Sequence, residues 1–155
     1  MDRVVAALLS GDAARVRSVV GYVQVPCEVE PEGLGAPPAC RSGEAEGTPV
    51  DVFQGAQCEG FYVRPEEVQS VIDGIVSAPL ELYAVFESGD RWPEGEYVAV
   101  FATDVLDRPD RDARAAVMAH GRMVGFHFGC AMTPEGYLDF YRVTPEELML
   151  LQPEP

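Results

Sequence analysis

Composition limits what this chain can be before any motif is considered. With 155 residues and 47% hydrophobic content, it is long enough for one domain spanning residues 1–155 with a buried core. The 26 acidic and 11 basic residues give a net charge of −15, which repels phosphate backbones and anionic lipids, so we expect no nucleic-acid binding. No apolar run reaches the ~18 residues of a membrane-spanning helix, so no membrane insertion is expected.

The first 20 residues predict helix, followed by a long loop. Apolar residues recur at spacings of three and four over residues 2–20, and Asp12 is placed to cap a second helical stretch. Residues 21–49 contain Glu30-Pro31-Glu32-Gly33 and Ala36-Pro37-Pro38, which fit neither a helix nor a central strand. A loop of this length is usually functional or tied down, and its cysteines are the expected tie.

The middle of the chain predicts short strands around one helix. Two strands are expected over Val50–Phe53 and Glu59–Val63, joined by a turn containing Gly55. Pro65 opens a helix with an apolar face at helical spacing, and a proline at position 79 ends it. Residues 80–87 then alternate with period 2, which is typical of a strand.

The last third of the chain predicts mainly antiparallel strands. Tyr97–Thr103 is a nearly continuous apolar strand, and Ala113–Ala119 and Arg122–Gly129 form the arms of a hairpin. Tyr137–Val143 is expected to add one more strand. A capping box with proline at its first helical position predicts a short terminal helix over Glu146–Leu151.

The four cysteines favour two disulfide bonds. None lies in a C-x-x-C pair, so neither a zinc ribbon nor a thioredoxin-like motif is supported, and four cysteines allow three pairings. Cys27–Cys40 is the natural local pair because it flanks a Pro/Gly-rich loop, which leaves Cys58–Cys130 to tie an early strand to a late one. Disulfides predict an extracytoplasmic protein, secreted or lipid-anchored, whose signal segment is absent from this sequence. Four buried free thiols in a cytoplasmic protein are the alternative.

Two motifs and the order of the elements carry a family resemblance. The motifs are Ala6-Ala7-Leu8-Leu9-Ser10-Gly11-Asp12 and Ala119-His120-Gly121-Arg122-Met123-Val124. With the order helix, loop, two strands, helix and four strands, they resemble the NTF2-like (SnoaL-like, cystatin-like α+β) superfamily. His120 stands where members usually have aspartate or asparagine, and the 21–49 loop stands where they typically have a second helix.

The resemblance implies an α+β fold in which a curved antiparallel β-sheet wraps around the N-terminal and central helices. The sheet and helices of such a cone enclose a pocket. Members include isomerases, cyclases, dehydratases, ligand carriers and non-enzymatic accessory domains, so the fold alone does not select a function. The open sheet face of this fold often pairs with a second copy, which makes a homodimer one expectation.

His127 is the first candidate catalytic residue. Strict alternation would place it on one strand face with Met123, Gly125 and Gly129, where two glycines leave open space around the imidazole, as a pocket wall would. A pKa near neutrality suits histidine for general acid–base work. The alternative is a structural histidine that hydrogen-bonds to backbone or water.

Tyr83, Tyr97 and Asp104 complete the candidates for a pocket, with Met123 as a further lining residue. Tyr97 lies on a central strand and Asp104 lies just past its end. The resemblance implies that a His/Tyr/Asp set can abstract a proton α to a carbonyl and hold the enolate. The alternative for the tyrosines is packing, with the hydroxyl at the rim.

No metal and no cofactor are expected. Four aspartates lack the D-x-D-x-D-G order of a calcium loop, and three interleaved arginines would neutralise them. Two histidines without close His/Cys spacing disfavour zinc. The aspartates are Asp104, Asp107, Asp110 and Asp112, and the arginines are Arg108, Arg111 and Arg114.

The sequence therefore supports two functional hypotheses. The first is a non-enzymatic, extracytoplasmic NTF2-like domain that binds a small apolar ligand or a protein partner. The alternative is a small-molecule isomerase, cyclase or dehydratase with catalytic candidates His127, Tyr97 and Asp104.

Overall fold

Two short helices open the chain, as the sequence predicts. The computed structural model describes residues 1–104 and 111–151. Helix α1 (Asp2–Leu9) and helix α2 (Ala13–Val19) are separated by a break at which Asp12 caps α2. Its carboxylate accepts hydrogen bonds from the backbone N–H groups of Ala14 (2.8 Å) and Arg15 (3.0 Å). The cap satisfies donors that the first turn leaves without partners.

The protein is α+β, with a mixed, open sheet rather than the antiparallel one expected. Along the sheet the strands follow the order β1-β2-β7-β6-β5-β4-β8, and β3 pairs with β2 outside this path. The β2–β7 pair is parallel, whereas the other strand pairs of the described residues are antiparallel. The strands are β1 (Val23–Pro26), β2 (Pro49–Ala56), β3 (Gly60–Val63), β4 (Glu81–Glu87), β5 (Tyr97–Thr103), β6 (Asp112–Ala119), β7 (Arg122–His127) and β8 (Leu148–Leu151).

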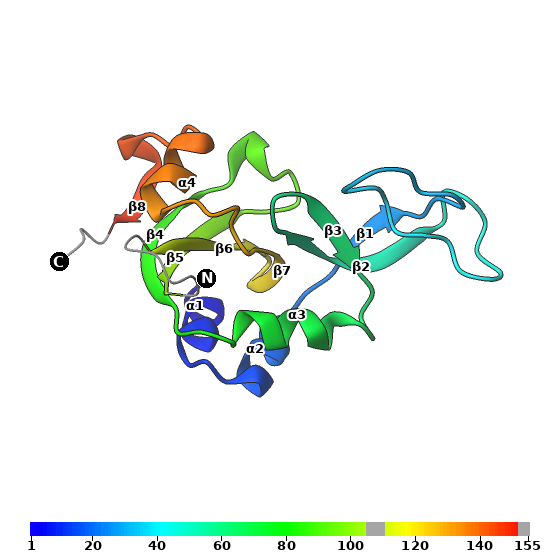
Figure 1. The fold of residues 1–155 in the computed structure, drawn as a ribbon, viewed down its shortest axis with the longest axis horizontal. Coiled ribbons are helices and arrows are strands. Elements are labelled where there is room, and N and C mark those ends of the chain that lie inside the picture. Colours follow the sequence, from blue (N-terminus) through cyan, green and yellow to red (C-terminus); the bar gives the residue numbers. More distant parts are fainter. Residues whose placement is uncertain (105–110, 152–155) are drawn as a thin grey trace.

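Helices cover the sheet on both sides (Figure 1). Helices α1, α2 and α3 (Val68–Ile75) lie against one face, and α3 buries the predicted apolar stripe that includes Val71 and Ile72. Helix α4 (Pro134–Phe140) packs on the opposite face against β5 and β6, so it occupies part of the surface expected to be open. None of the helices in the described part of the chain has the length and apolar character needed to span a membrane.

The central hairpin forms where the sequence predicts it. Strands β6 and β7 are joined by His120 and Gly121, which both have positive φ angles of 50° and 71°. Two consecutive residues with positive φ match the twist that a two-residue hairpin turn requires. Glycine suits the second position because it has no Cβ to clash with the backbone.

The 21–49 segment is not wholly a loop, and the predicted turn at Gly55 is wrong. Residues Val23–Pro26 form β1, which pairs with β2. Gly55 lies inside β2, opposite Phe61 of β3, and the ring of Phe61 covers it. A Cβ at Gly55 would stand 2.1 Å from Phe61 Cζ. Glycine makes room for a cross-strand ring at this position.

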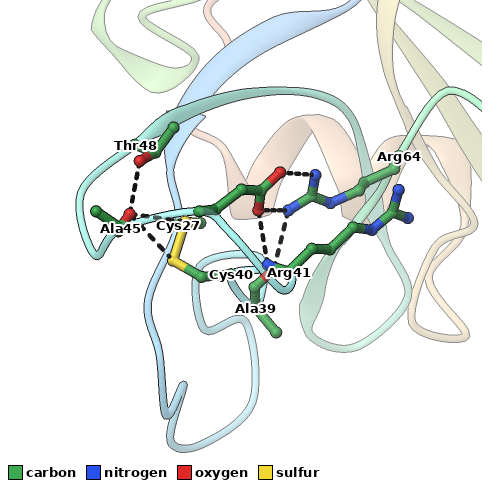
Figure 2. The surroundings of a disulfide bond; sticks show 8 residues. Cys27, Ala39, Cys40, Arg41, Ala45, Thr48 and Arg64 are labelled. Carbon is green, nitrogen blue, oxygen red and sulfur yellow. Dashed lines mark hydrogen bonds and ion pairs between the residues drawn. A yellow bond between two sulfur atoms is a disulfide. The ribbon is translucent and has the colours of Figure 1, made fainter.

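Figure 2 shows how the rest of this segment is tied down. The Cys27–Cys40 disulfide closes it, and the Arg64 guanidinium holds the Glu44 carboxylate through two hydrogen bonds of 2.8 and 2.7 Å. Because Arg64 donates these hydrogen bonds, the pKa of Glu44 falls to about 2. Arg64 also donates to the carbonyl of Ala39 at 3.0 Å. The loop therefore has a fixed conformation with its own disulfide, as its composition predicts.

Two predictions for the C-terminal segment are wrong. Tyr137–Val143 is not a strand: residues 134–140 form α4, which begins with Thr133 as a capping residue and Pro134 in the first turn. The terminal helix over Glu146–Leu151 is replaced by one 3-10 turn, which keeps the predicted capping box, and then by β8. Pairing with β4, which would be the edge strand without β8, outweighs the local helical signal there.

Candidate functional site

A pocket of about 590 Å³ opens between α3 and the ends of β3, β6 and β7. Its wall combines apolar side chains, hydroxyl groups, one arginine and one aspartate. Small-molecule sites in proteins usually have volumes of roughly 300–1,000 Å³ and mostly apolar linings. The lining residues are Gln57, Cys58, Phe61, Val63, Ser70, Val71, Gly74, Ser77, Asp112, Arg114, Phe128, Gly129, Cys130 and Ala131.

One wall of the pocket is held by a disulfide bond. Cys58, after β2, is joined to Cys130, after β7, with the two Cα atoms 4.7 Å apart. Both predicted cysteine pairings are therefore present, and the described residues contain no free cysteine. The bridge fixes the two loops that end the parallel β2–β7 pair, which is where the pocket begins.

Two glycines let the pocket wall form. Gly129 has a φ of 70°, and a Cβ there would stand 2.4 Å from the carbonyl oxygen of Ala113. On α3, a Cβ at Gly74 would stand 3.2 Å from Phe128 Cε1. The chain therefore turns sharply after Phe128, and the Phe128 ring lies close against the helix.

Arg114 provides the cationic group of the pocket. It projects from β6, is partly buried, donates a hydrogen bond to the carbonyl of Phe128 and lies with its guanidinium carbon 5.2 Å from the Phe128 ring centroid. Burial lowers the pKa of Arg114 from its ordinary value. Within the described residues, the hydrogen bond and ring contact of Arg114 are with Phe128 rather than with the aspartate cluster, of which Asp107 and Asp110 lie outside those residues. One signal was available: Arg114 is the single charged residue in the run Ala113–Ala119.

His127 lies on the opposite face of the sheet from this pocket. The register shifts between Val117 and Met118 of β6, because β7 contains an extra residue at the bulge. Met123 consequently packs with the α1–α3 side, whereas His127 packs near Trp92 and Tyr137 on the α4 side. The predicted common face of Met123 and His127 is therefore wrong.

A cluster of aromatic side chains surrounds His127. Its Nδ1 lies 2.8 Å from the Tyr137 hydroxyl, and the Trp92 ring centroid lies 5.6 Å from that of the imidazole. Burial lowers the pKa of His127 to about 4 and raises the pKa of Tyr137. A neutral imidazole with a hydroxyl partner fits the structural alternative for this histidine.

The other candidates are dispersed. The Tyr83 hydroxyl donates to the Glu135 carboxylate on α4 at 2.6 Å, whereas Tyr97 packs on the α1–α3 side. Asp104 is exposed beyond the far end of β5, about 23 Å from Tyr97 at roughly 3.3 Å per residue. The structure therefore does not bring His127, Tyr97 and Asp104 together, and none of the predicted pocket residues lines the pocket against α3.

The aspartate cluster has ion-pair partners where it is described. Asp104 Oδ1 lies 3.2 Å from Arg111 Nε, and Arg111 also pairs with Glu81. Asp107, Asp110 and Arg108 lie outside the described residues. Within residues 1–104 and 111–151 there is no group of three or more His, Cys, Asp or Glu side chains that could hold a metal ion.

Comparison of the chain with protein-family models, with curated proteins and with solved structures finds no match. The chain is an α+β protein with an open mixed sheet and two disulfides. Its function has to be inferred from the pocket and the side chains that line it.

Proposed function

We propose that this chain is a non-enzymatic, extracytoplasmic binding domain of the NTF2-like type that takes a small apolar ligand in the pocket against α3. One observation carries this proposal: the pocket of about 590 Å³ has Phe61, Val71 and Phe128 in its wall. Burying apolar ligand surface against such side chains contributes about 25 cal/mol per Å².

The position of the pocket supports the NTF2-like part of the proposal. In a cone-shaped fold, the ligand lies between the helices and the sheet face that they cover. Helices α1–α3 lie on one face of the sheet (Figure 1). The residues that line the pocket belong to α3 and to that same face. The mixed sheet and α4 on the other face are this chain's own departures from the expected pattern.

The disulfides support an oxidising compartment. The structure contains two disulfide bonds, which the reducing conditions of the cytoplasm would oppose. A domain that is secreted or lipid-anchored fits this chemistry.

No observation favours the enzymatic alternative. An isomerase, cyclase or dehydratase of the expected kind needs His127, Tyr97 and Asp104 on one substrate. Here His127 and Tyr97 lie on opposite faces of the sheet, and Asp104 lies at the far end of β5.

The proposal can be tested with a neutral apolar fluorophore, N-phenyl-1-naphthylamine. We expect saturable binding with one site per chain and at least a tenfold loss of affinity in Ser70→Trp, because Ser70 lines the pocket and a tryptophan would fill it. Gln69→Trp is the matched control, since Gln69 is exposed on the same helix but does not line the pocket. Absence of wild-type binding, or equal loss in both variants, would contradict the proposal.

A further inference from the structure

Arg114 differs from the other partly buried arginines in how its charge is balanced. Within the described residues four arginines are partly buried, and three of them hold a carboxylate. The pairs are Arg64 with Glu44, Arg91 with Glu147, and Arg111 with Glu81. Arg114 has instead one backbone carbonyl and one aromatic ring, both from Phe128.

This difference is notable in a chain so rich in acid. With 26 acidic residues available, three arginine side chains that are 12%, 22% and 29% exposed have each acquired an acidic partner. Burying a charge is unfavourable unless the charge is paired, and the burial of Arg114 already lowers its pKa. Within the described residues, the Arg114 guanidinium is the one partly buried arginine that has no carboxylate partner.

The guanidinium has the capacity and the position to bind one. It carries five N–H donors in a plane, and the carbonyl of Phe128 is its one hydrogen-bond acceptor recorded within the described residues. Arg114 lines the pocket against α3, so a ligand in that pocket can reach the remaining donors. Two parallel N–H groups match the two oxygens of a carboxylate.

The rest of the pocket sets the body of such a ligand. Phe61, Val71 and Phe128 offer an apolar surface close to the guanidinium. Asp112 lines the same pocket and is two residues from Arg114 on the same strand face.

We propose that the ligand of this pocket is an apolar monocarboxylate, with its head group on the Arg114 guanidinium and its hydrocarbon or aryl body against Phe61, Val71 and Phe128. This inference rests on the proposed function, since it assigns a ligand class to the same pocket.

The test uses two compounds that differ mainly in the head group, 4-phenylbutanoate and 4-phenyl-1-butanol, each displacing bound N-phenyl-1-naphthylamine. We expect the wild-type chain to bind the carboxylate at least tenfold more tightly than the alcohol. Arg114→Gln should lose this preference, because its affinity for the carboxylate should fall at least tenfold more than its affinity for the alcohol. Arg114→Lys should keep a reduced preference, because it retains the charge but not the planar fork.

Arg122→Gln is the matched control, because it makes the same change in net charge. Arg122 is exposed, donates to the carbonyl of Ser18 and does not line the pocket. Equal wild-type affinity for the two compounds, equal loss of preference in Arg114→Gln and Arg122→Gln, or failure of both compounds to displace the bound fluorophore would each overturn the inference. Binding of the fluorophore would still support the pocket in those cases, whereas its absence would remove the proposed function as well.

Discussion

The two faces of the sheet each bury a basic side chain. The side chain on one face is neutral and enclosed by aromatic rings, and the one on the other face is charged and lies beside a pocket. On the α4 face, His127 is packed among Trp92, Tyr137 and Tyr141, and its low pKa of about 4 keeps the imidazole neutral. On the α3 face, the positively charged side chain of Arg114 lies beside an open pocket. Desolvation acts on both groups, but only the histidine can respond by giving up its charge near neutral pH.

The comparison shows how a buried basic group can indicate either packing or binding. The Tyr137 hydroxyl is a hydrogen-bond partner of His127 Nδ1, and aromatic rings surround the imidazole, so packing accounts for this side chain. Arg114 has a carbonyl and a ring but no carboxylate, within the part of the chain that the structure describes. In the sequence, the glycine-flanked His127 therefore indicates the packed face of the sheet. Arg114, the single charged residue in an alanine-rich strand, indicates the face with the open pocket.

The largest effect is expected from cutting the bridge beside the pocket. Replacing Cys58 and Cys130 by serine opens a loop with a sequence separation of 72, against 13 for Cys27 and Cys40. The loss in unfolding free energy should be about 4 kcal/mol for the first pair and about 3 kcal/mol for the second. Guanidinium chloride unfolding, followed by the fluorescence of Trp92, measures both. A greater loss from the Cys27/Cys40 variant would show that the pocket face does not depend on its covalent tie.

An intermediate effect is expected from pH on the α4 face. Burial holds the pKa of folded His127 at about 4, below the ~6.5 of an unfolded histidine. Between these values the unfolded chain binds a proton that the folded chain does not, so stability falls as the pH drops from 6.5 towards 4.

Between pH 7 and pH 5 this loss should amount to about 2 kcal/mol, measured by urea unfolding at the two pH values. His127→Gln should remove that part of the pH dependence. His120→Gln should leave it in place, because the His120 side chain is 90% exposed. If the two variants behave alike, the histidine on the packed face is not held neutral.

The smallest effect is expected from a methyl group added at Gly74, next to the Phe128 ring in the pocket wall. Gly74→Ala brings a Cβ to within 3.2 Å of the Phe128 ring, which borders the pocket and has room to move. Since alanine is the better helix former by about 1 kcal/mol, the variant should be stabilised by up to that amount. Fluorophore binding should weaken, because the ring moves into the pocket. Destabilisation instead would show that this face is packed as tightly as the other.

The sequence predicted elements whose apolar pattern alone decides the structure. Strand β5 has the predicted bounds, Tyr97–Thr103, and the α3 stripe is buried as expected. The turn at His120 and Gly121 and both cysteine pairs were also predictable, because turn geometry and a flanking loop leave few alternatives.

The failures share a different cause, which is dependence on neighbours distant in the sequence. Tyr137–Val143 contains the aromatic and apolar side chains that favour a strand, but Tyr137 is buried against the sheet from a helix that begins at Thr133. Strand β8 exists because β4 offers it an edge. The bulge that separates Met123 from His127 is a property of the β6–β7 register and leaves no local signal. The site was missed for the same reason, since α3 and the ends of three strands build it.

The parallel β2–β7 pair has a consequence for the order of folding. Its register joins Gln54 to Gly125, so a segment of about 70 residues must close before these strands meet. The β1–β2–β3 unit and the β4–β7 meander consist of local antiparallel pairs, which form faster than long-range pairs. During oxidative refolding Cys27–Cys40 can therefore close within the first unit, whereas Cys58–Cys130 waits for the two units to dock. The pocket lies at that junction, so it forms only once the two units have docked.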